Sequence, residues 1–426
     1  MDEQIKANPT DDYWLQVDLS LRQLRGVTEG AAMSPDAKDF PRPLSFFDLY
    51  ILNSGGDTDD IASAVNATQG RAPPGLAQDR CSALVKLLPH NASLLISQDA
   101  WDGLTSMLRV YKWYDLGYRT AAGAEVATGA MSSYPGIILS SDDFYTLSSG
   151  LAVVETTMEV YNNELYYAYV RSNGTVLEWL RNIVANRLAT SAPDWTQLFG
   201  RYNSGTCNNQ WLVVDYNKFT PHRPVLADTL WLLEQIPGTI ESRDMSHALA
   251  DQRYWPSYNT PYFQDVFQKS GTGAQAKAHG SWFTYNATPR ALIFHRDQDK
   301  VTDISTMKHM MRYNNFRHDP LSACACDPPY SGENGISSRC DLNPRNGTYP
   351  FATLGHRCTA GYDSKITSDT LIAQLASHAI SGPTYDELPV FEWSKADLTE
   401  DECGGPHDGH PDKFDFDWVQ VRWPGL

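Results

Sequence analysis

The sequence DRCSALVKLL, residues 79–88, places a cysteine between two very different kinds of sequence. The ten residues before Cys81, RAPPGLAQDR, are rich in Pro, Gly and polar residues, which predicts an exposed linker that is easily cut. The residues after Cys81 are mostly apolar, which predicts a strand. From this position alone, Cys81 is a candidate disulfide partner, a candidate buried core thiol or a candidate nucleophile.

A cysteine gains a special chemistry when it becomes the first residue of a chain. Its free α-amino group has a pKa of about 7.7 and can accept the proton of the neighbouring thiol, so one residue supplies both nucleophile and base. Such a site needs a cysteine at the start of a strand, a cleavable segment before it, and amide or guanidinium donors elsewhere. Cys81 meets the first two requirements.

The segments that follow Cys81 predict an α+β fold, because strands and helices come in blocks rather than in strict alternation. Residues 82–88 and 93–101 around a Pro/Asn turn predict a β-hairpin. Residues 175–189 have one apolar face and predict a helix. Residues 53–80 are expected to form a short helix at best, and the region after 320 reads as loop-rich. We expect other strands at 135–141, 144–149, 151–158, 210–216 and 291–297, a strand or short helix at 229–238, other helices at 11–27 and 303–316, and an ordinary loop at 271–276.

Composition bounds the function. Among 426 residues, 42% are apolar and 12% aromatic, which is typical of a globular protein with a large core. The net charge of −17 and the lack of a Lys/Arg block argue against nucleic acid or an anionic membrane as the main partner. The sequence contains no run of eighteen apolar residues, so it predicts no transmembrane segment. The first residues, MDEQIKANPTDDYW, do not read as a signal or transit peptide, which taken literally indicates the cytosol.

Two features favour the secretory pathway instead. The chain has seven cysteines, which would fit three disulfides and one free thiol, with Cys340–Cys358 as the first expected pair. Their irregular spacing does not favour a zinc site, so no metal is expected. The chain also has five N-x-S/T glycosylation sequons, at Asn66, Asn91, Asn173, Asn286 and Asn346.

Motifs spread along the chain point to a known family. In order, they are CSALVKLLP (81–89), SSYPG (132–136), DDFY (142–145), EW-RN-VANRLA (178–189), NSGT-NNQW (203–211), LEQIPG (233–238), YW-SYN-PYF (254–263), TPRA (288–291), MRYN-F-HDPLS (311–322), CDLNP (340–344) and NGTYPF (346–351). From about residue 8 to the C-terminus, the chain resembles the phospholipase B-like family of lysosomal or secreted N-terminal-nucleophile hydrolases. The resemblance implies a four-layer αββα sandwich, with two antiparallel sheets between helix layers.

The resemblance also implies a precursor that cuts itself between Arg80 and Cys81. Residues 1–80 would then be the end of the N-terminal fragment, and residues 81–426 the catalytic fragment of the same domain, with the fragments remaining associated. Family members carry a signal peptide and a further N-terminal region, so we expect this chain to lack its natural start and the protein to be lysosomal or secreted. The resemblance implies no cofactor. The oligomeric state stays open, with a homodimer as one option.

Motif by motif, the resemblance implies roles for individual residues. Cys81 is the expected nucleophile, for self-cleavage and then for acyl transfer. The amides of Asn208, Asn209 or Asn259 are candidates for the oxyanion hole. The remaining candidates are Thr157 near the thiol, Arg290 on the amine or on a substrate oxygen, and Trp101 and Gln98 in the substrate pocket. A core tryptophan, an exposed strand threonine and a surface salt bridge are the alternatives for Trp101, Thr157 and Arg290.

Gln98 stands where the family often has a histidine, and a glutamine cannot titrate. Three hypotheses stay open, and this departure is the reason for the third. The first is a hydrolase that removes acyl chains from phospholipids, and the second is an amidase acting on N-acyl amides. The third is a self-processed lysosomal glycoprotein that binds lipid with little catalysis.

Overall fold

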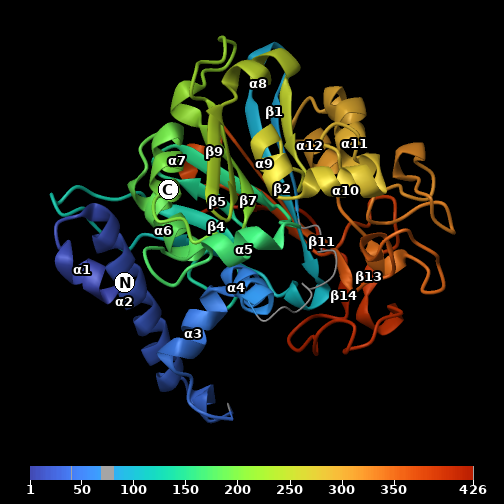
Figure 1. The fold of residues 1–426 in the computed structure, drawn as a ribbon. Coiled ribbons are helices and arrows are strands. Elements are labelled where there is room, and N and C mark those ends of the chain that lie inside the picture. Colours follow the sequence, from blue (N-terminus) through green and yellow to red (C-terminus); the bar gives the residue numbers. More distant parts are fainter. Residues whose placement is uncertain (40, 69–80, 426) are drawn as a thin grey trace.

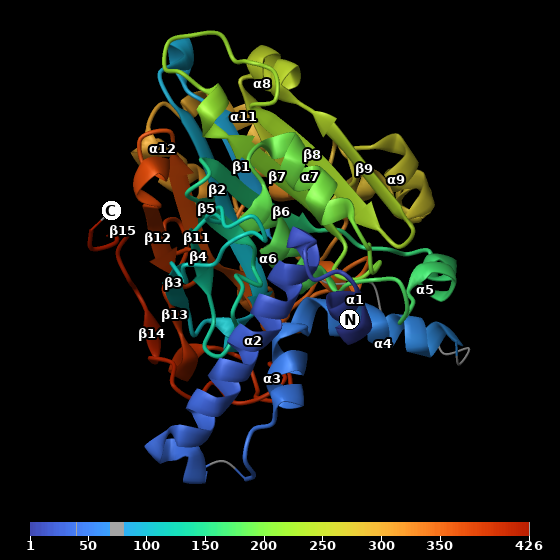
Figure 2. The same ribbon diagram turned by 90° about the vertical axis from the view of Figure 1, so that its left-hand side faces the viewer.

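The computed structural model describes residues 1–39, 41–68 and 81–425, and their arrangement is shown in Figures 1 and 2. Two large antiparallel sheets form the centre. The six-stranded sheet has the order β10 (Tyr254–Ser257), β1 (Ser82–Leu87), β2 (Leu94–Gly103), β11 (Thr359–Ser368), β12 (Ser377–Ser381) and β15 (Val419–Val421). The seven-stranded sheet runs in chain order through β3 (Val110–Tyr114), β4 (Gly129–Ser133), β5 (Phe144–Leu147), β6 (Leu151–Thr157), β7 (Asn209–Asp215), β8 (Leu230–Ile236) and β9 (Thr239–Asp244).

Successive side chains of a strand point to opposite faces of its sheet, and the apolar side chains on the two inner faces pack against each other. In β1, Ala83 and Val85 contribute to a core shared with Val154 and Leu212 of the other sheet. Leu84, between them in sequence, belongs instead to the core on the opposite face. Strand β1 is therefore buried on both faces, which explains its nearly continuous apolar sequence.

Helices cover the outer face of each sheet. α11 (Pro289–Asp297) and α12 (Ile304–Arg312) pack on the six-stranded sheet, while α6 (Glu178–Leu188) and α7 (Ala192–Gly200) pack on the seven-stranded sheet (Figure 1). The order of layers is thus helix, sheet, sheet, helix. The predicted αββα sandwich of the α+β class is confirmed.

The N-terminal helices add to one helix layer. α1 (Asp2–Ala7) and α2 (Asp12–Met33) precede α3 (Phe46–Asn53) and α4 (Gly55–Thr68), and α2 lies against α6 (Figure 2). Apolar side chains of α2, including Trp14 and Val17, share a core with Trp179 and Leu180 of α6. Residues on the two sides of segment 69–80 are therefore joined by packing. Smaller elements complete the structure: α5 (Asn163–Tyr169), α8 (Ser246–Gln252), α9 (Gln264–Lys269), α10 (Thr272–His279), β13 (Phe391–Glu392) and β14 (Lys413–Phe414).

Several predicted elements differ from the structure. Residues 291–297 were predicted as a strand but belong to α11, because Pro289 is favoured in a first helical turn and Arg290, Ile293, Phe294 and Asp297 form one buried helical face. Residues 135–141 form no strand, residues 271–276 begin the helix α10, and residues 55–68 form a four-turn helix rather than a short one. Strand β11, TAGYDSKITS, lies in the region predicted as loop-rich. All ten of its residues are buried, but its polar sequence has no apolar pattern that would have predicted a strand.

The cysteine pairing also differs from the prediction. The two disulfides of the structure join Cys324 to Cys326 and Cys358 to Cys403. The predicted Cys340–Cys358 pair is wrong, because Cys340 is buried beside an acid and its thiol donates to Glu333 Oε2 at 2.8 Å. The predicted total of three disulfides is also wrong. The unpaired cysteines are Cys81, Cys207 and Cys340.

Candidate active site

Cys81 stands at the entrance to strand β1, between neighbouring strands β10 and β2. Its side chain is buried, with 3% of its surface exposed. Its backbone φ of 75° lies in the left-handed region. This conformation costs a residue other than glycine on the order of 1–3 kcal/mol, and such strain persists only where the surrounding structure enforces it. The backbone at Cys81 is therefore held under strain next to its own N-terminal peptide bond.

Arg290 fixes the backbone of Cys81 from the first turn of α11. One of its terminal nitrogens donates to the Cys81 carbonyl oxygen at 2.7 Å and to Ser82 Oγ at 3.2 Å. Its guanidinium carbon also lies 4.3 Å from the centre of the Trp101 ring, a cation–π contact. The Trp101 indole in turn donates to Asp99 Oδ2 at 2.7 Å. The predicted residues Cys81, Arg290 and Trp101 thus form one contiguous group.

The seven-stranded sheet brings a carboxylate to the thiol. The Cys81 thiol donates to Glu155 Oε1 in β6, with an S···O distance of 3.9 Å. Thr157 Oγ1 donates to the other oxygen of Glu155 at 3.5 Å. With the amide of Asn209 oriented so that both its ends are satisfied, its nitrogen donates to Glu155 Oε2 at 3.1 Å. Thr157 and Asn209 therefore contact the carboxylate of Glu155, which points toward the Cys81 thiol.

Glu155 was not predicted as a site residue. It interrupts the apolar strand LAVVETT and is only 3% exposed. A charged side chain in the middle of a buried strand is rare unless it has polar partners. This exception to the apolar pattern was a usable signal in the sequence, although nothing local connects residue 155 to residue 81.

Burial governs the ionisation of the thiol. Burial raises the pKa of Cys81 well above its ordinary value, and the charge of Glu155 raises it further. The backbone N–H of Trp101 and the charge of Lys365 act in the opposite direction without reversing the shift. In the uncut chain the thiol is therefore protonated at neutral and acid pH, so its attack requires a nearby proton acceptor.

A network of balanced charges lies between the sheets near the site. Lys365 Nζ donates to Asp142 Oδ2 at 2.6 Å and also to Asp363. Arg109 joins the same two carboxylates, at 2.5 Å to Asp142 and 3.0 Å to Asp363. Burial alone would raise the pKa of Asp142, but the two cations hold it below its usual value. We name Arg109, Asp142, Asp363 and Lys365 the balanced cluster.

A small cavity adjoins Arg290. Asn259 and Arg290 line it together with the aromatic side chains of Tyr161, Tyr258, Trp282 and Phe283. Asn259 has a left-handed backbone, with φ of 68°, and its amide nitrogen donates to the Thr157 carbonyl oxygen at 2.6 Å. The surface of this cavity is mostly polar, and it adjoins the polar group around Cys81.

Two predicted site residues make contacts elsewhere. The Asn208 amide donates to Asp60 Oδ2 at 3.0 Å and to the Gly205 carbonyl oxygen at 3.1 Å. Gln98 lies between the sheets, where its amide donates to the carbonyl oxygens of Asp142 at 2.5 Å and Glu155 at 2.8 Å. Gln98 therefore links β2 to β6, the strand that carries Glu155, and it does not line the small cavity.

The sequons differ in their surroundings. Asn173, Asn286 and Asn346 are exposed. Asn91 is part-buried, and its amide donates to the Arg223 carbonyl oxygen at 2.7 Å. The side chain of Asn66, together with Arg80 and the predicted linker, lies outside the described residues. In the described part of the chain, no helix is long and apolar enough to cross a membrane, and no three His, Cys, Asp or Glu side chains group as metal ligands.

Comparisons with known proteins agree with the resemblance in the sequence. The family model "Phospholipase B" matches residues 1–421. The human protein "Putative phospholipase B-like 2" is 45% identical over 99% of this chain and 72% of its own length. "Phospholipase B-like protein B" of Dictyostelium discoideum is 38% identical over 98% of this chain and 71% of its own length.

One similar solved structure is a mutant of the conjugated bile acid hydrolase from Clostridium perfringens. The match has a TM-score of 0.39 and 9% identity, and it covers 80% of this chain and 97% of that chain. A likeness this weak carries no argument about the reaction.

Proposed function

Since this chain belongs to the phospholipase B family, we propose that it is a hydrolase whose nucleophile is Cys81, exposed as an N-terminal residue when the Arg80–Cys81 bond is cut. The observation that carries the proposal is the convergence on Cys81 of Arg290 at its carbonyl oxygen and Glu155 at its thiol. A cysteine that served only as a core thiol would need neither partner.

The first step is self-cleavage. Glu155 accepts the proton of the Cys81 thiol, and the sulfur attacks the carbonyl carbon of residue 80. The peptide C–N bond breaks, the amine nitrogen of Cys81 takes a proton, and a thioester joins residue 80 to the sulfur. Water then hydrolyses the thioester, which releases the carboxyl group of residue 80 and restores the thiol. The left-handed backbone at Cys81 favours this step because breaking the bond releases strain.

The second step is acyl transfer. The new α-amino group of Cys81 accepts the thiol proton, and the thiolate attacks the acyl carbonyl of the substrate. The leaving alcohol or amine takes the proton as its bond to the acyl carbon breaks. Water then attacks the resulting thioester and releases the carboxylic acid.

Polar groups around the thiol supply the rest of the machinery. Asn259 lines the small cavity and is the preferred donor to the oxyanion, for which one such donor contributes on the order of 3–4 kcal/mol. Arg290 positions the backbone of Cys81, and Glu155, held by Thr157 and Asn209, orients the new amine. The Asn208 amide donates to both Asp60 and Gly205, and Asn208 does not line the small cavity, so we assign it a positioning role.

The small cavity, with a volume of about 10 Å³ and a mostly polar surface, supports a polar group of the substrate next to Cys81. Arg290 and Asn259 would contact the oxygen of the acyl carbonyl there. Family membership favours phospholipids as the acyl donor. The chemistry of the second step serves an N-acyl amide equally, so that class is the alternative substrate.

We propose a lysosomal or secreted location for the protein. Two disulfides and the exposed sequons at Asn173, Asn286 and Asn346 support it. The packing of α2 on α6 supports the proposal that the two fragments remain associated after cleavage.

The experiment uses the secreted protein with phosphatidylcholine and N-acyl-ethanolamine panels at pH 4.5 and 7. The variants are Cys81→Ala, Asn259→Ala and, as a surface control, Asn173→Gln, with release of fatty acid as the measurement. We expect Cys81→Ala to abolish release, Asn259→Ala to lower kcat by about 100-fold, and Asn173→Gln to have no effect on kcat. Release that survives in Cys81→Ala contradicts the proposal, and release from the amides alone assigns the alternative substrate.

A further inference from the structure

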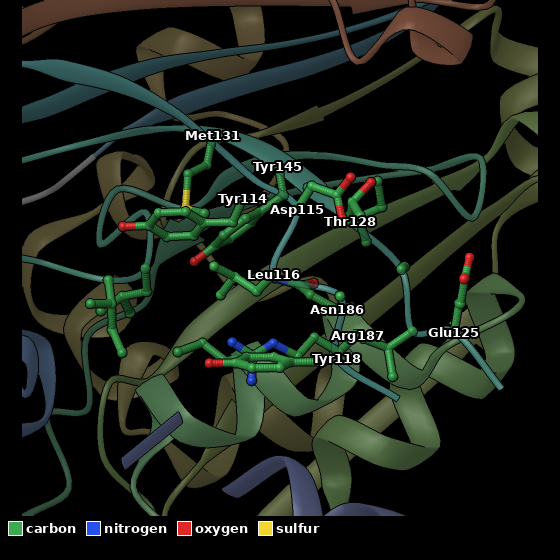
Figure 3. A pocket seen from close by; sticks show the side chains of 18 residues that line it. Tyr114, Asp115, Leu116, Tyr118, Glu125, Thr128, Met131, Tyr145, Asn186 and Arg187 are labelled. Atoms are coloured by element: carbon green, nitrogen blue, oxygen red, sulfur yellow. The ribbon is translucent and has the colours of Figure 1, made fainter. Parts of the chain in front are cut away.

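A second, larger cavity lies on the outer face of the seven-stranded sheet (Figure 3). One wall is formed by Met131, Tyr145 and Leu147 of β4 and β5, and others by residues 114–118, by residues 125–128 and by α6. It has a volume of about 220 Å³ and opens to solvent. Pockets for drug-sized ligands commonly hold about 300–1,000 Å³, so this cavity suits a smaller ligand. No residue that lines it also lines the small cavity beside Cys81, so it is a separate site.

Slightly more than half of its inner surface is apolar. The side chains of Tyr114, Leu116, Met131 and Tyr118 project toward the interior in Figure 3, and Ile183 of α6 completes the wall. Leu116 is 43% exposed. An open cavity with apolar walls of this kind fits a flexible hydrocarbon chain.

Arg187 is the cation among the residues that line the cavity. It lies at the end of α6, and its guanidinium stacks on the Tyr118 ring, 4.7 Å from the ring centre. It donates to Ser20 Oγ at 3.0 Å and Gln23 Oε1 at 2.9 Å, which are both neutral. Throughout the described chain, no carboxylate lies within 4.0 Å of it. Three of its five N–H groups therefore have no acceptor among the described residues.

Arg187 remains a cation under physiological conditions, although burial lowers its pKa to about 10. A partly buried cation with spare donors and no counterion attracts an anion. Asp115 and Glu125 also line the cavity, but both are exposed, and Glu125 pairs with Arg119 at 2.7 Å. These acids at the rim disfavour an anion there, so the only favourable place for a negative charge is at Arg187.

We infer that this cavity binds a single-chain carboxylate, a fatty acid, with its carboxylate on Arg187 and its chain along Tyr114, Leu116 and Met131. The site does not depend on the reaction at Cys81. If that reaction releases fatty acids, the ligand has the chemistry of its product.

The test is calorimetric titration of the secreted protein with decanoate, decyl phosphate and 1-decanol, below the concentrations at which they aggregate. These probes share one chain and differ only in their head group. We expect saturable binding of one decanoate, with 1-decanol at least about tenfold weaker. Equal affinity for decanoate and decanol overturns the role of Arg187, and binding of decyl phosphate about tenfold tighter than decanoate overturns the assignment of a carboxylate.

Variants locate the site. Arg187→Gln should weaken decanoate at least about tenfold and leave decanol unchanged, since only the charged hydrogen bonds are lost. Arg243→Gln, which changes an exposed arginine outside the cavity lining, is the matched control and should bind as the native protein does. Leu116→Asp changes an exposed wall residue without disturbing the contacts of Arg187, and should weaken both ligands. Undiminished decanoate binding in Arg187→Gln or in Leu116→Asp overturns the inference, as does its loss in Trp282→Ala, which would move the site to the small cavity.

Discussion

Asp142 and Asp143 are neighbours in the chain, yet their carboxylates lie in two buried clusters of opposite character. Asp142 belongs to the balanced cluster, where two carboxylates meet two cations. Asp143 belongs to a second group, the acid cluster, formed with Asp57 and Glu178. The backbone is left-handed at Ser141 and at Asp143, with φ of 72° and 54°. This sharp turn allows the side chains of Asp142 and Asp143 to point into different clusters.

The acid cluster has three carboxyl groups and one nearby cation. That cation, Arg181, donates its hydrogen bonds to neutral oxygens, including the Phe199 carbonyl oxygen at 2.7 Å and Gln235 Oε1 at 2.6 Å. Burial raises the pKa of Asp143 to about 7, even though Tyr145 and Asn182 donate to it. Burial and the neighbouring acids also raise the pKa of Glu178 well above its ordinary value.

The comparison shows that burial alone does not decide ionisation. An acid that meets a cation stays charged, and an acid that meets other acids keeps its proton. The balanced cluster therefore fixes structure beside Cys81 over a broad range of pH. The acid cluster, which joins α4 to α6, makes stability depend on pH.

The largest expected effect comes from breaking the balanced cluster. Lys365→Met should lower the free energy of unfolding by about 3–5 kcal/mol at pH 5, because it leaves Asp142 and Asp363 short of one cation in a buried site. Chemical denaturation measures it. Lys395→Met is the control, since Lys395 is 73% exposed in its side chain and its pair with Glu392 should contribute less than about 1 kcal/mol. Equal losses in both variants would show that the balanced cluster does not act as described.

The second effect is a fall in stability as pH rises. A carboxyl whose pKa is raised on folding binds more protons in the folded than in the unfolded state, so the free energy of unfolding decreases with pH between the two pKa values. For Asp143 these are about 4 when unfolded and about 7 when folded. Asp60, Asp99 and Glu234, with pKa values raised by burial to about 7, 7 and 8, act in the same direction.

We therefore expect the melting temperature to be highest near pH 4–5 and to fall as the pH rises to 8, with each carboxyl whose pKa is raised from about 4 to about 7 contributing a loss of up to roughly 4 kcal/mol in stability. Thermal unfolding across this range measures the profile. A melting temperature that rises from pH 5 to 8 would contradict the protonated state of the acid cluster.

The smallest effect is a gain. Glu178→Gln should stabilise the protein by about 1 kcal/mol or more at pH 7.5, because a neutral amide no longer has to be protonated on folding. It should also flatten the pH profile and have little effect at pH 4.5. Glu164→Gln, an exposed acid of α5, is the matched control. A destabilisation by Glu178→Gln at pH 7.5 would mean that the carboxylate is ionised and paired.

The sequence predicted the parts of the fold that depend on local apolar patterns. The β1–β2 hairpin, α6 and the strands β6 to β8 carry such patterns. Strand β11 does not, because its buried Asp363 and Lys365 replace apolar side chains and are satisfied only by Arg109 and Asp142 far along the chain.

The site could be predicted only in part for the same reason. Cys81 was found from its place after a cleavable segment, and Arg290 from its motif, although its segment was predicted as a strand. Glu155 and the balanced cluster depend on contacts between sheets, which no local pattern reports. Arg187 was part of a quoted motif, but its lack of a counterion became visible only in the folded chain.

The central claim is that Cys81 cuts the bond before itself. The most direct test is intact mass spectrometry of native protein and of Cys81→Ala, both secreted from cultured cells and incubated at pH 4.5. The account predicts two fragments from the native protein, the second beginning at Cys81, and a single uncut chain from Cys81→Ala. A native chain that stays whole, or a Cys81→Ala chain cut at the same bond, would contradict it.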